Sequence, residues 1–343
     1  MLKTYQGVPE GLLRAQADEL EERLGGPSLI EVPGRREPPL FVTVLLHGNE
    51  TTGWEAVREV LADFQGRPLP RTLLLFIGNV RAARSGVRRL PEQPDYNRVW
   101  PGTTLPDSPE QRLAAEVVAR VRSRGCFASI DVHNNTGLNP HYGCVNRLEG
   151  PYLQLAALFS RTVVYFTRPQ GVQSLAMARV APAITVECGQ PGSPGAAEHA
   201  AELISSALHL SRLPEGVPAD ISVYHTVAAV RIPQQCSFGF GDEAAGVDLQ
   251  LMDDLERCNF RDLPEGTVFA RVAPESRAFF TVEDNEGREA AAEFFQRDGE
   301  TIRLRRPAMP AMLACNTTAI RQDVLCYLME PVRLGTPPAA EPA

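Results

Sequence analysis

Residues 41–50 read FVTVLLHGNE, and this stretch contains both an apolar run and candidate metal-ligating residues. Its first six residues are mostly apolar and β-branched, which predicts a strand buried on both faces. His47 and Glu50 follow in a Gly-containing turn, where the strand stops and a helix is expected to begin. A histidine and a glutamate at this spacing can converge on one metal ion, but a catalytic zinc site commonly has three protein ligands. A third ligand must therefore come from elsewhere in the chain.

Similar apolar runs alternate with amphipathic segments through the first two-thirds of the chain. The further expected strands are 72–77, 127–132, 163–166 and 183–186, and the expected helices lie near 53–64, 109–123, 151–161 and 194–210. Strands that alternate with helices predict an α/β fold, with a largely parallel or mixed sheet covered by helices on both sides. In such sheets ligands gather at the carboxyl ends of the strands.

Two more strand ends carry side chains suited to a metal-dependent site. His133 follows one apolar run and is the candidate third ligand, and Asp131 on the same side of that strand can hydrogen-bond an imidazole N–H. Glu187 directly follows the run 183–186, which makes it a candidate general base for a zinc-bound water. Each fragment alone also occurs by chance or as an ordinary loop residue. The prediction therefore depends on the three strand ends meeting.

An arginine cluster stands out in this acidic chain. Five arginines lie between positions 81 and 98, whereas the whole chain has 34 Lys+Arg against 42 Asp+Glu and a net charge of -8. Arginine suits a planar two-point grip on a carboxylate, and Asn97 beside Arg98 adds amide donors. Such a charge run is also commonly a solvated face, and some of these arginines are expected to be exposed.

Composition excludes several classes of function. The net charge of -8 argues against nucleic acid as a partner, because phosphate binding needs a basic face. No window approaches about 18 consecutive apolar residues, and the N-terminus lacks an apolar signal core, so we expect neither a membrane partner nor export. The seven cysteines are scattered without a C-x-x-C pair, which predicts free thiols in a reducing compartment. A cytoplasmic protein is expected.

The character of the chain changes near residues 213–218, LPEGVP. Short candidate strands follow this Pro/Gly-rich link, at 227–232, 267–272, 278–282, 301–304 and 324–328. We therefore predict a catalytic domain over 1–213, a small β-rich domain over 214–334 and a frayed tail over 335–343.

The motifs together resemble one known family. His47-Gly48-Asn49-Glu50, Asn79-x-x-Ala82 with Gly86-x-Arg88, Asp95-Tyr96-Asn97-Arg98 with Pro101-Gly102, Asp131-Val132-His133-Asn134 and Glu187-x-Gly189 occur in the order and spacing of the succinylglutamate desuccinylase/aspartoacylase branch of the zinc carboxypeptidase superfamily. The resemblance covers roughly residues 40–200. It implies a zinc-carboxypeptidase-like α/β domain followed by a β-rich domain, and hydrolysis of the amide bond in a small, anionic N-acylated amino acid.

The resemblance also implies roles for individual residues. His47, Glu50 and His133 match the residues that hold one zinc ion, and Glu187 matches the base that later protonates the leaving nitrogen. Arg88 matches the arginine that stabilises the oxyanion, in agreement with the electrostatic role expected of such a group. The pair Asn97 and Arg98 matches the residues that bind a substrate carboxylate.

Val80 and Tyr96 replace the family's usual proline and leucine conservatively, and two positions that contact substrate in aspartoacylases depart more seriously from the family pattern. Aspartoacylases carry an arginine shortly before the catalytic glutamate, for which Arg179 is the candidate here, and a tyrosine in the C-terminal domain. The corresponding late stretch, residues 292–295, reads AEFF and has phenylalanine instead. The sequence leaves two alternatives open, a zinc carboxypeptidase acting on peptides and a catalytically silent metal- or ligand-binding homologue. It does not predict the acyl group, the amino acid or the oligomeric state.

Overall fold

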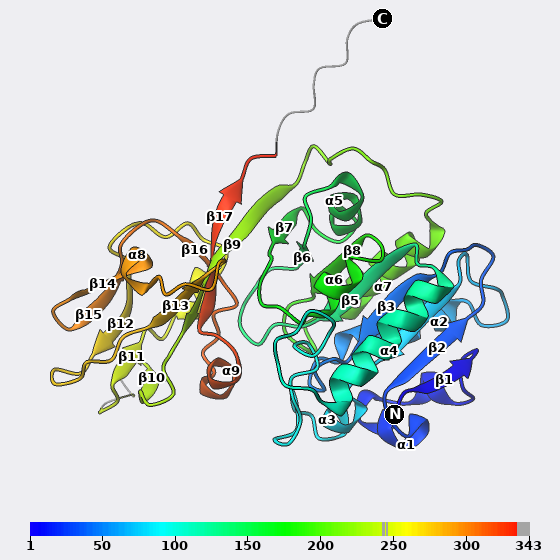
Figure 1. Cartoon of the computed structure of the whole chain (residues 1–343), viewed down its shortest axis with the longest axis horizontal. Coiled ribbons are helices and arrows are strands. Elements are labelled where there is room, and N and C mark those ends of the chain that lie inside the picture. Colours follow the sequence, from blue (N-terminus) through cyan, green and yellow to red (C-terminus); the bar gives the residue numbers. More distant parts are fainter. Residues whose placement is uncertain (242–243, 245, 335–343) are drawn as a thin grey trace, which may run out of the picture. The chain divides into compact units, whose positions relative to one another are not determined.

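The computed structural model describes residues 1–241, 244 and 246–334, which form two compact units (Figure 1). Unit 1 contains Met1–Asn134 and His141–Ser222, and unit 2 contains Asn135–Pro140 and Val223–Leu334. The predicted tail over 335–343 lies outside the described residues. Assigning 1–213 to a catalytic domain and 214–334 to a second domain remains a prediction.

A mixed β-sheet forms the centre of unit 1. Its strands are, in chain order, β1 (Lys3–Gln6), β2 (Ser28–Val32), β3 (Leu40–Val44), β4 (Leu73–Ile77), β5 (Ala128–His133), β6 (Tyr142–Val145), β7 (Thr162–Tyr165) and β8 (Ala183–Glu187). They are arranged in the order β1-β2-β4-β3-β5-β8-β6-β7. The central strands β4, β3, β5 and β8 are parallel to one another, whereas β2 runs antiparallel to β4 and β6 antiparallel to β8.

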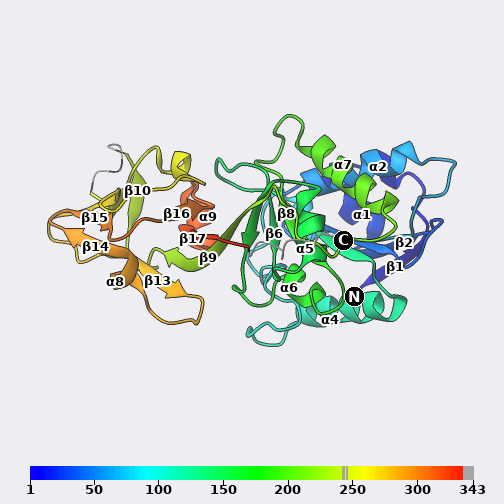
Figure 2. The same ribbon diagram turned by 90° about the horizontal axis from the view of Figure 1, so that it is seen from above.

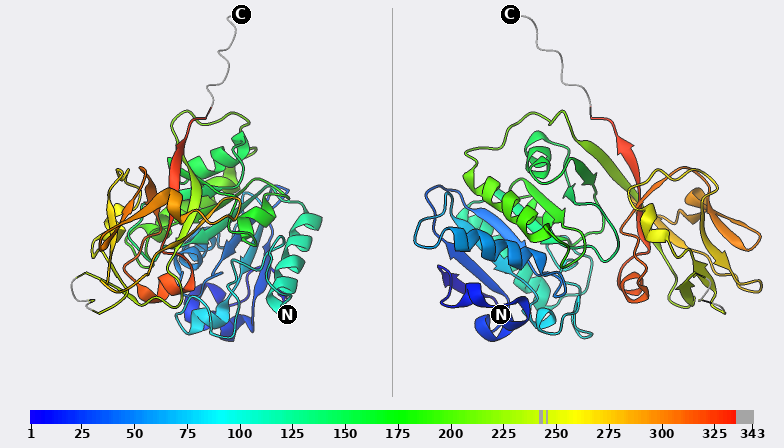
Figure 3. Two further views of the ribbon diagram at one scale, coloured as in Figure 1. Left: turned by 60° about the vertical axis from the view of Figure 1, so that its left-hand side comes forward. Right: turned by 180° about the vertical axis from the view of Figure 1, so that it is seen from behind.

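Helices cover both faces of this sheet. They are α1 (Leu20–Leu24), α2 (Thr52–Asp63), α3 (Val80–Arg84), α4 (Pro109–Arg124), α5 (Gly150–Ala157), α6 (Gln173–Met177) and α7 (Ala196–His209), with 3-10 helices at Leu12–Arg14 and Ala17–Glu19. Figure 2 shows α2 and α7 on one side of the strands and α4 and α6 on the other. The view from behind in Figure 3 likewise has α2 (blue) and α7 (green) in front of the sheet. The predicted α/β fold class is confirmed.

The four central strands are apolar because both of their faces are covered. Every residue of β3, β4, β5 and β8 is buried, as expected for strands packed between two helical layers. The chain passes from β3 to β4 on one side of β3, and later returns to β5 on the other side. Such a reversal of strand order opens a crevice at the carboxyl ends of the strands. The three candidate strand ends, after β3, β5 and β8, belong to this edge.

Unit 2 is β-rich, as predicted. Its strands are β9 (Ser222–Arg231), β10 (Phe238–Phe240), β11 (Leu249–Leu251), β12 (Val268–Val272), β13 (Thr281–Asp284), β14 (Phe295–Asp298), β15 (Thr301–Leu304), β16 (Met309–Ala311) and β17 (Cys326–Val332), and its helices are α8 (Ala291–Phe294), α9 (Thr317–Gln322) and a 3-10 helix at Leu255–Cys258. Antiparallel pairing joins β13, β9, β17 and β16, and a second sheet has the order β10-β11-β12-β15-β14. Phe269, Phe280 and Phe295 meet edge to face in the core of the unit.

No helix in the described part of the chain is both long enough and apolar enough to cross a membrane.

Candidate functional site

A strained turn directs the chain from β3 to His47. Leu45 has a φ of 56°, in the left-handed region that a leucine rarely adopts. The turn is held from both sides of Leu45, because Gly78 N–H donates to the Val44 carbonyl at 3.0 Å and Asn79 N–H donates to the Leu45 carbonyl at 2.6 Å. Tertiary hydrogen bonds therefore impose a backbone conformation that the local sequence does not favour, directly before the first candidate ligand.

The next turn requires a glycine. A Cβ atom at Gly48 would lie 2.2 Å from the backbone of Ala82 and Ala83 in α3, so no larger residue fits there. Gly48 N–H also donates to the Arg88 carbonyl at 3.1 Å. The segment that carries His47 and Glu50 is thus fastened to the segment that carries the arginine cluster.

The three predicted metal ligands come together as one buried group. Each of His47, Glu50 and His133 offers a ligand atom within 4.8 Å of the other two. Nδ1 of His47 lies 2.8 Å from Oε1 of Glu50, and Nδ1 of His133 lies 2.8 Å from Oε2. All three residues are at most 5% exposed. The two inner imidazole nitrogens therefore face the two oxygens of a single carboxylate.

The outer nitrogen of each imidazole faces another carboxylate. Nε2 of His47 lies 2.9 Å from Oδ1 of Asp95, and Nε2 of His133 lies 2.9 Å from Oδ2 of Asp131. Because an ionised carboxylate only accepts, each Nε2 carries a proton, and Nδ1 of a neutral ring presents its lone pair to Glu50. Lone pairs repel at that distance unless a cation lies between them. The donor set and its outer carboxylates therefore fit a bound metal ion.

The pKa shifts of His133 and Glu50 also indicate that this buried cluster stabilises a positive charge. Burial works to lower the pKa of His133, but Asp131 and Glu50 outweigh it and hold that pKa well above its usual value. Burial works to raise the pKa of Glu50, yet His47 and His133 hold it far below its usual value. The cluster thus stabilises a positive charge among its carboxylates, which a proton or a metal ion can supply.

Asp95 is a site residue whose role was not predicted from the sequence. Its Oδ1 accepts from the Asn97 N–H at 2.7 Å and contacts His47, and its Oδ2 accepts from Nε and Nη2 of Arg88 at 3.1 and 2.9 Å. Burial alone would raise the pKa of Asp95, but Arg88 and His47 keep it well below its usual range. Asp95 therefore stays ionised and couples Arg88 to the candidate metal-ligand group, which consists of His47, Glu50 and His133. The sequence signal that could have indicated this role is the position of Asp95, two residues before Asn97.

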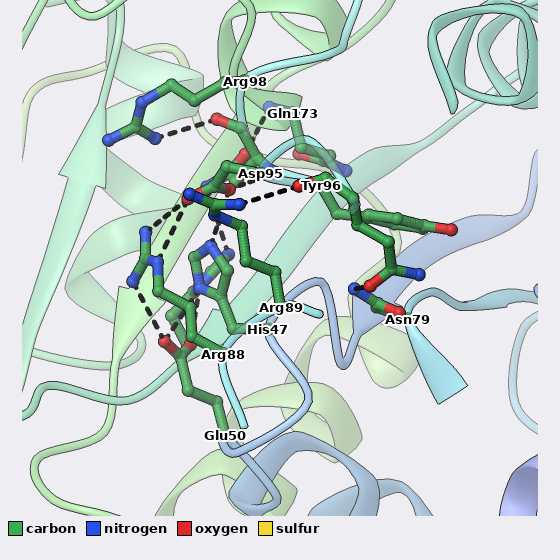
Figure 4. Close-up of polar contacts among 12 residues, drawn as sticks. His47, Glu50, Asn79, Arg88, Arg89, Asp95, Tyr96, Arg98 and Gln173 are labelled. Carbon is green, nitrogen blue, oxygen red and sulfur yellow. Dashed lines mark hydrogen bonds and ion pairs between the residues drawn. The ribbon is translucent and has the colours of Figure 1, made fainter. Parts of the chain in front are cut away.

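Arg88 reaches the metal-ligand group itself. Its Nη1 lies 3.7 Å from Oε1 of Glu50, while the rest of its guanidinium is held by Asp95. Figure 4 shows the Arg88 side chain between Asp95 and Glu50, beside the His47 ring. A fixed guanidinium next to a metal-ligand group is suited to stabilising negative charge that develops there.

Asn97 and Arg98 border the same group. Nδ2 of Asn97 lies 3.4 Å from Nε2 of His133, and its Oδ1 accepts from the backbone N–H of Gln173 at 2.9 Å. Arg98 is half-buried, and its Nη1 donates to the Asn97 carbonyl at 2.9 Å. The role of Gln173 was also missed in the sequence. Its Nε2 donates to hydroxyls of β3 and β5 at 2.9 and 3.0 Å, which anchors the start of α6 to the sheet.

Glu187 ends β8 directly beside the end of β5, where it is paired in register with His133. The side chain is buried, with the residue 8% exposed. Burial raises the pKa of Glu187 to about 7, with His133 working to lower it and Glu50 to raise it further. A carboxyl group with this pKa can take up and release a proton near neutral pH.

A model of the succinylglutamate desuccinylase/aspartoacylase catalytic domain matches residues 37–210, which is about half of the chain. This chain belongs to the succinylglutamate desuccinylase/aspartoacylase family. No curated protein sequence matches it significantly.

Several solved structures share this fold. A succinylglutamate desuccinylase from Vibrio parahaemolyticus is 15% identical, with a TM-score of 0.60 over 89% of this chain and 86% of that one. Murine aminoacylase 3 is 17% identical, with a TM-score of 0.58 over 88% and 98%. The product-bound ectoine utilization protein EutE (DoeB) from Ruegeria pomeroyi is 15% identical, with a TM-score of 0.56 over 89% and 88%.

The two positions that depart from the family pattern lie outside the buried group. Arg179 is exposed on the turn after α6, where its guanidinium lies beside Gly102. Phe294 and Phe295 are 3% and 1% exposed and belong to the core of unit 2. The late stretch of phenylalanines thus serves packing within that unit.

Proposed function

We propose that this chain is a zinc-dependent hydrolase that cleaves the amide bond of an N-acylated amino acid or a similar small carboxylate. The observation that carries the proposal is the buried His47/Glu50/His133 group with a fixed arginine on one side and a carboxyl of pKa about 7 at the adjacent strand end. Each of these groups has a defined task in amide hydrolysis.

We propose that His47, Glu50 and His133 hold one zinc ion. Two imidazoles and one carboxylate form the ligand set of many catalytic zinc sites, which leave a further position for water or substrate. Zinc bound there would act as a Lewis acid that polarises the scissile carbonyl and lowers the pKa of water. Asp95 and Asp131 keep the two Nε2 atoms protonated, so that Nδ1 of each ring is free to bind the metal.

Glu187 is proposed to move the proton. As a carboxylate it accepts a proton from the attacking water, and as a carboxylic acid it returns that proton to the leaving nitrogen. Both steps are efficient when the pKa lies near the working pH, which burial achieves here by raising it to about 7. The same residue thus acts first as base and then as acid.

The arginines and Asn97 are proposed to hold the substrate's charges. Arg88, fixed by Asp95 and 3.7 Å from Glu50, stabilises the oxyanion that forms at the attacked carbonyl. Asn97 and Arg98 bind the carboxylate of the amino acid and so orient the amide bond. Arg179 is proposed as a further substrate-binding residue, consistent with the guanidinium lying beside the loop that follows Arg98.

The substrate class rests on the charge of the site and on the family. A small anion suits a site in which Arg88 and Arg98 lie close to the metal-ligand group and to Asp95. Structures named as desuccinylase and aminoacylase share the fold. We propose a cytoplasmic location, because all seven cysteines are free thiols, as expected in a reducing compartment.

Metal analysis and a substrate panel test the proposal. The purified protein is expected to contain about one zinc ion per chain and to release amino acid from acylated amino acids faster than from peptides. His47→Ala should abolish both zinc binding and turnover. Zinc-loaded protein that hydrolyses only peptides would instead identify a carboxypeptidase. A wild-type protein that binds no zinc would contradict both the acyl-amino-acid hydrolase and the carboxypeptidase.

A further inference from the structure

Asn134 joins three segments at the edge of the sheet where the site lies. It directly follows His133 and is 5% exposed. Its Nδ2 donates to Oγ1 of Thr52 and to the Gly189 carbonyl, both at 2.9 Å, and its Oδ1 accepts from the Thr52 N–H at 3.4 Å. Each hydrogen-bonding atom of the side chain is thus engaged, which holds the amide in one orientation.

The backbone and the side chain of Asn134 reach opposite halves of the site. The backbone N–H donates to Oε2 of Glu50 at 3.1 Å, on the metal-ligand side. The side-chain amide binds the carbonyl of Gly189, which lies two residues after Glu187. A backbone hydrogen bond from Cys188 N–H to the His133 carbonyl, 2.9 Å long, ties the same two strand ends. One residue therefore spans the distance between the metal ligands and the proton-transferring carboxyl.

The turn at Gly189 has little freedom to move away from Asn134. Gly189 has a φ of +68°, and a Cβ atom there would lie 3.2 Å from Nε2 of His141. The His141 ring is held in turn by His199, with their Nδ1 atoms 2.7 Å apart. The turn after Glu187 is thus enclosed between the amide of Asn134 and the ring of His141.

We propose that Asn134 is a positioning residue that sets the distance between Glu187 and the metal-ligand group, acting through the Gly189 carbonyl. The inference rests on the proposed function, in which Glu187 must lie within reach of the water and of the leaving nitrogen. Misplacing a catalytic group by about 1 Å can cost about 100-fold in rate. Loss of the side-chain amide is therefore expected to impair proton transfer while the backbone contact to Glu50 persists.

The test uses Asn134→Ser in the zinc-loaded full chain, because serine adds no charge beside the metal ligands and leaves the backbone N–H in place. We expect kcat to fall about 10- to 100-fold, with KM for an acylated amino acid and zinc affinity each within about threefold of wild type. Amide hydrogen exchange of the segment 187–193 should become at least about tenfold faster, since the Gly189 carbonyl loses its partner.

Asn259 provides a matched control. It is a buried asparagine of unit 2 whose Nδ2 donates to the carbonyls of Leu138 and Leu313 at 2.9 and 2.8 Å, and whose Oδ1 accepts from the Leu313 N–H at 2.9 Å. Asn259→Ser should lower the melting temperature to a similar extent without changing kcat or exchange at 187–193. Should Asn134→Ser fold poorly, Asn134→Leu keeps the approximate side-chain volume, adds no charge and removes the same two donated hydrogen bonds.

The outcomes separate this inference from the proposed function. A fall in kcat together with faster exchange at 187–193, at preserved KM and zinc affinity, supports positioning by Asn134. An unchanged kcat in either Asn134 variant overturns it, as does a fall in kcat that the Asn259 control shares. A wild-type protein that binds zinc but releases no amino acid from any acylated substrate would refute the proposed function instead, and the exchange rates would still report whether Asn134 holds the turn.

Discussion

Replacing Glu187 with glutamine is expected to stabilise the protein while it removes activity. The carboxyl group is buried, and its pKa is raised from 4.5 to about 7. A group with a raised folded-state pKa binds its proton more tightly when folded, so the free energy of unfolding declines as the pH rises from about 4.5 through 7. At 1.36 kcal/mol per pKa unit, the raised pKa of Glu187 costs the wild type about 3 kcal/mol at pH 8 and about 1 kcal/mol at pH 5.5.

Glutamine cannot ionise, so the variant escapes this cost. The stability difference between Glu187→Gln and wild type should therefore grow by about 2 kcal/mol from pH 5.5 to pH 8 in metal-free protein. Any constant effect of the amide cancels in this comparison. Urea unfolding followed by tryptophan fluorescence measures it for unit 1, because both tryptophans, Trp54 and Trp100, are buried there. Glu198→Gln, at an exposed position of α7, is the control and should change stability by less than about 0.5 kcal/mol at both pH values.

Activity provides the second half of this test. Zinc-loaded Glu187→Gln is expected to lose about 10²- to 10⁴-fold in kcat, the usual contribution of a general acid–base group, and to retain its metal. A stability difference that does not grow with pH would refute the argument from burial. Retained turnover with zinc bound would refute the assigned catalytic role of Glu187.

Three further predictions concern the same site. The kcat/KM of the wild type should rise through about pH 7 as Glu187 loses its proton, and a profile that is flat from pH 5.5 to 8 would contradict this. Asp95→Asn should weaken zinc binding about 10- to 100-fold, because His47 loses a carboxylate partner; chelator competition measures the effect, and Asp248→Asn in unit 2 should leave it unchanged. Arg98→Met should raise KM for an acylated amino acid and have little further effect on its carboxamide analogue; equal losses for both substrates would argue against a carboxylate contact.

The central part of the fold could be predicted because its determinants are local. The apolar runs at 41–46, 72–77, 127–132 and 183–186 correspond to β3, β4, β5 and β8 within one or two residues. Ser108 caps α4 as its sequence indicates, accepting from the Gln111 N–H at 3.2 Å. The helix predicted near 194–210 is α7, which begins two residues later, at Ala196, with Gly195 as its N-cap. The strands β1, β2 and β6 were missed, since their short and partly polar sequences acquire strand character through their partners.

The residue types of the site could also be predicted from the sequence, but the contacts between their side chains could not. Imidazole, carboxylate and guanidinium groups at strand ends indicate metal and anion binding, because these side chains are intrinsically suited to it. Asp95 became a site residue only because the fold brings a segment 48 positions away from His47 within 2.9 Å of its ring. In the same way Gln173 and Asn134 act through contacts with strands and turns distant in the chain.

The pKa of Glu187 shows most clearly which properties follow from the sequence and which arise only from tertiary packing. Its chemistry as a carboxylic acid follows from the residue itself, and its place after an apolar run follows from the local pattern. The rise of its pKa to about 7 comes from burial among neighbours contributed by β5 and by the turn after β3. Burial and the distances between charges exist only after the chain has packed, because both depend on segments that the sequence separates and the sheet brings together.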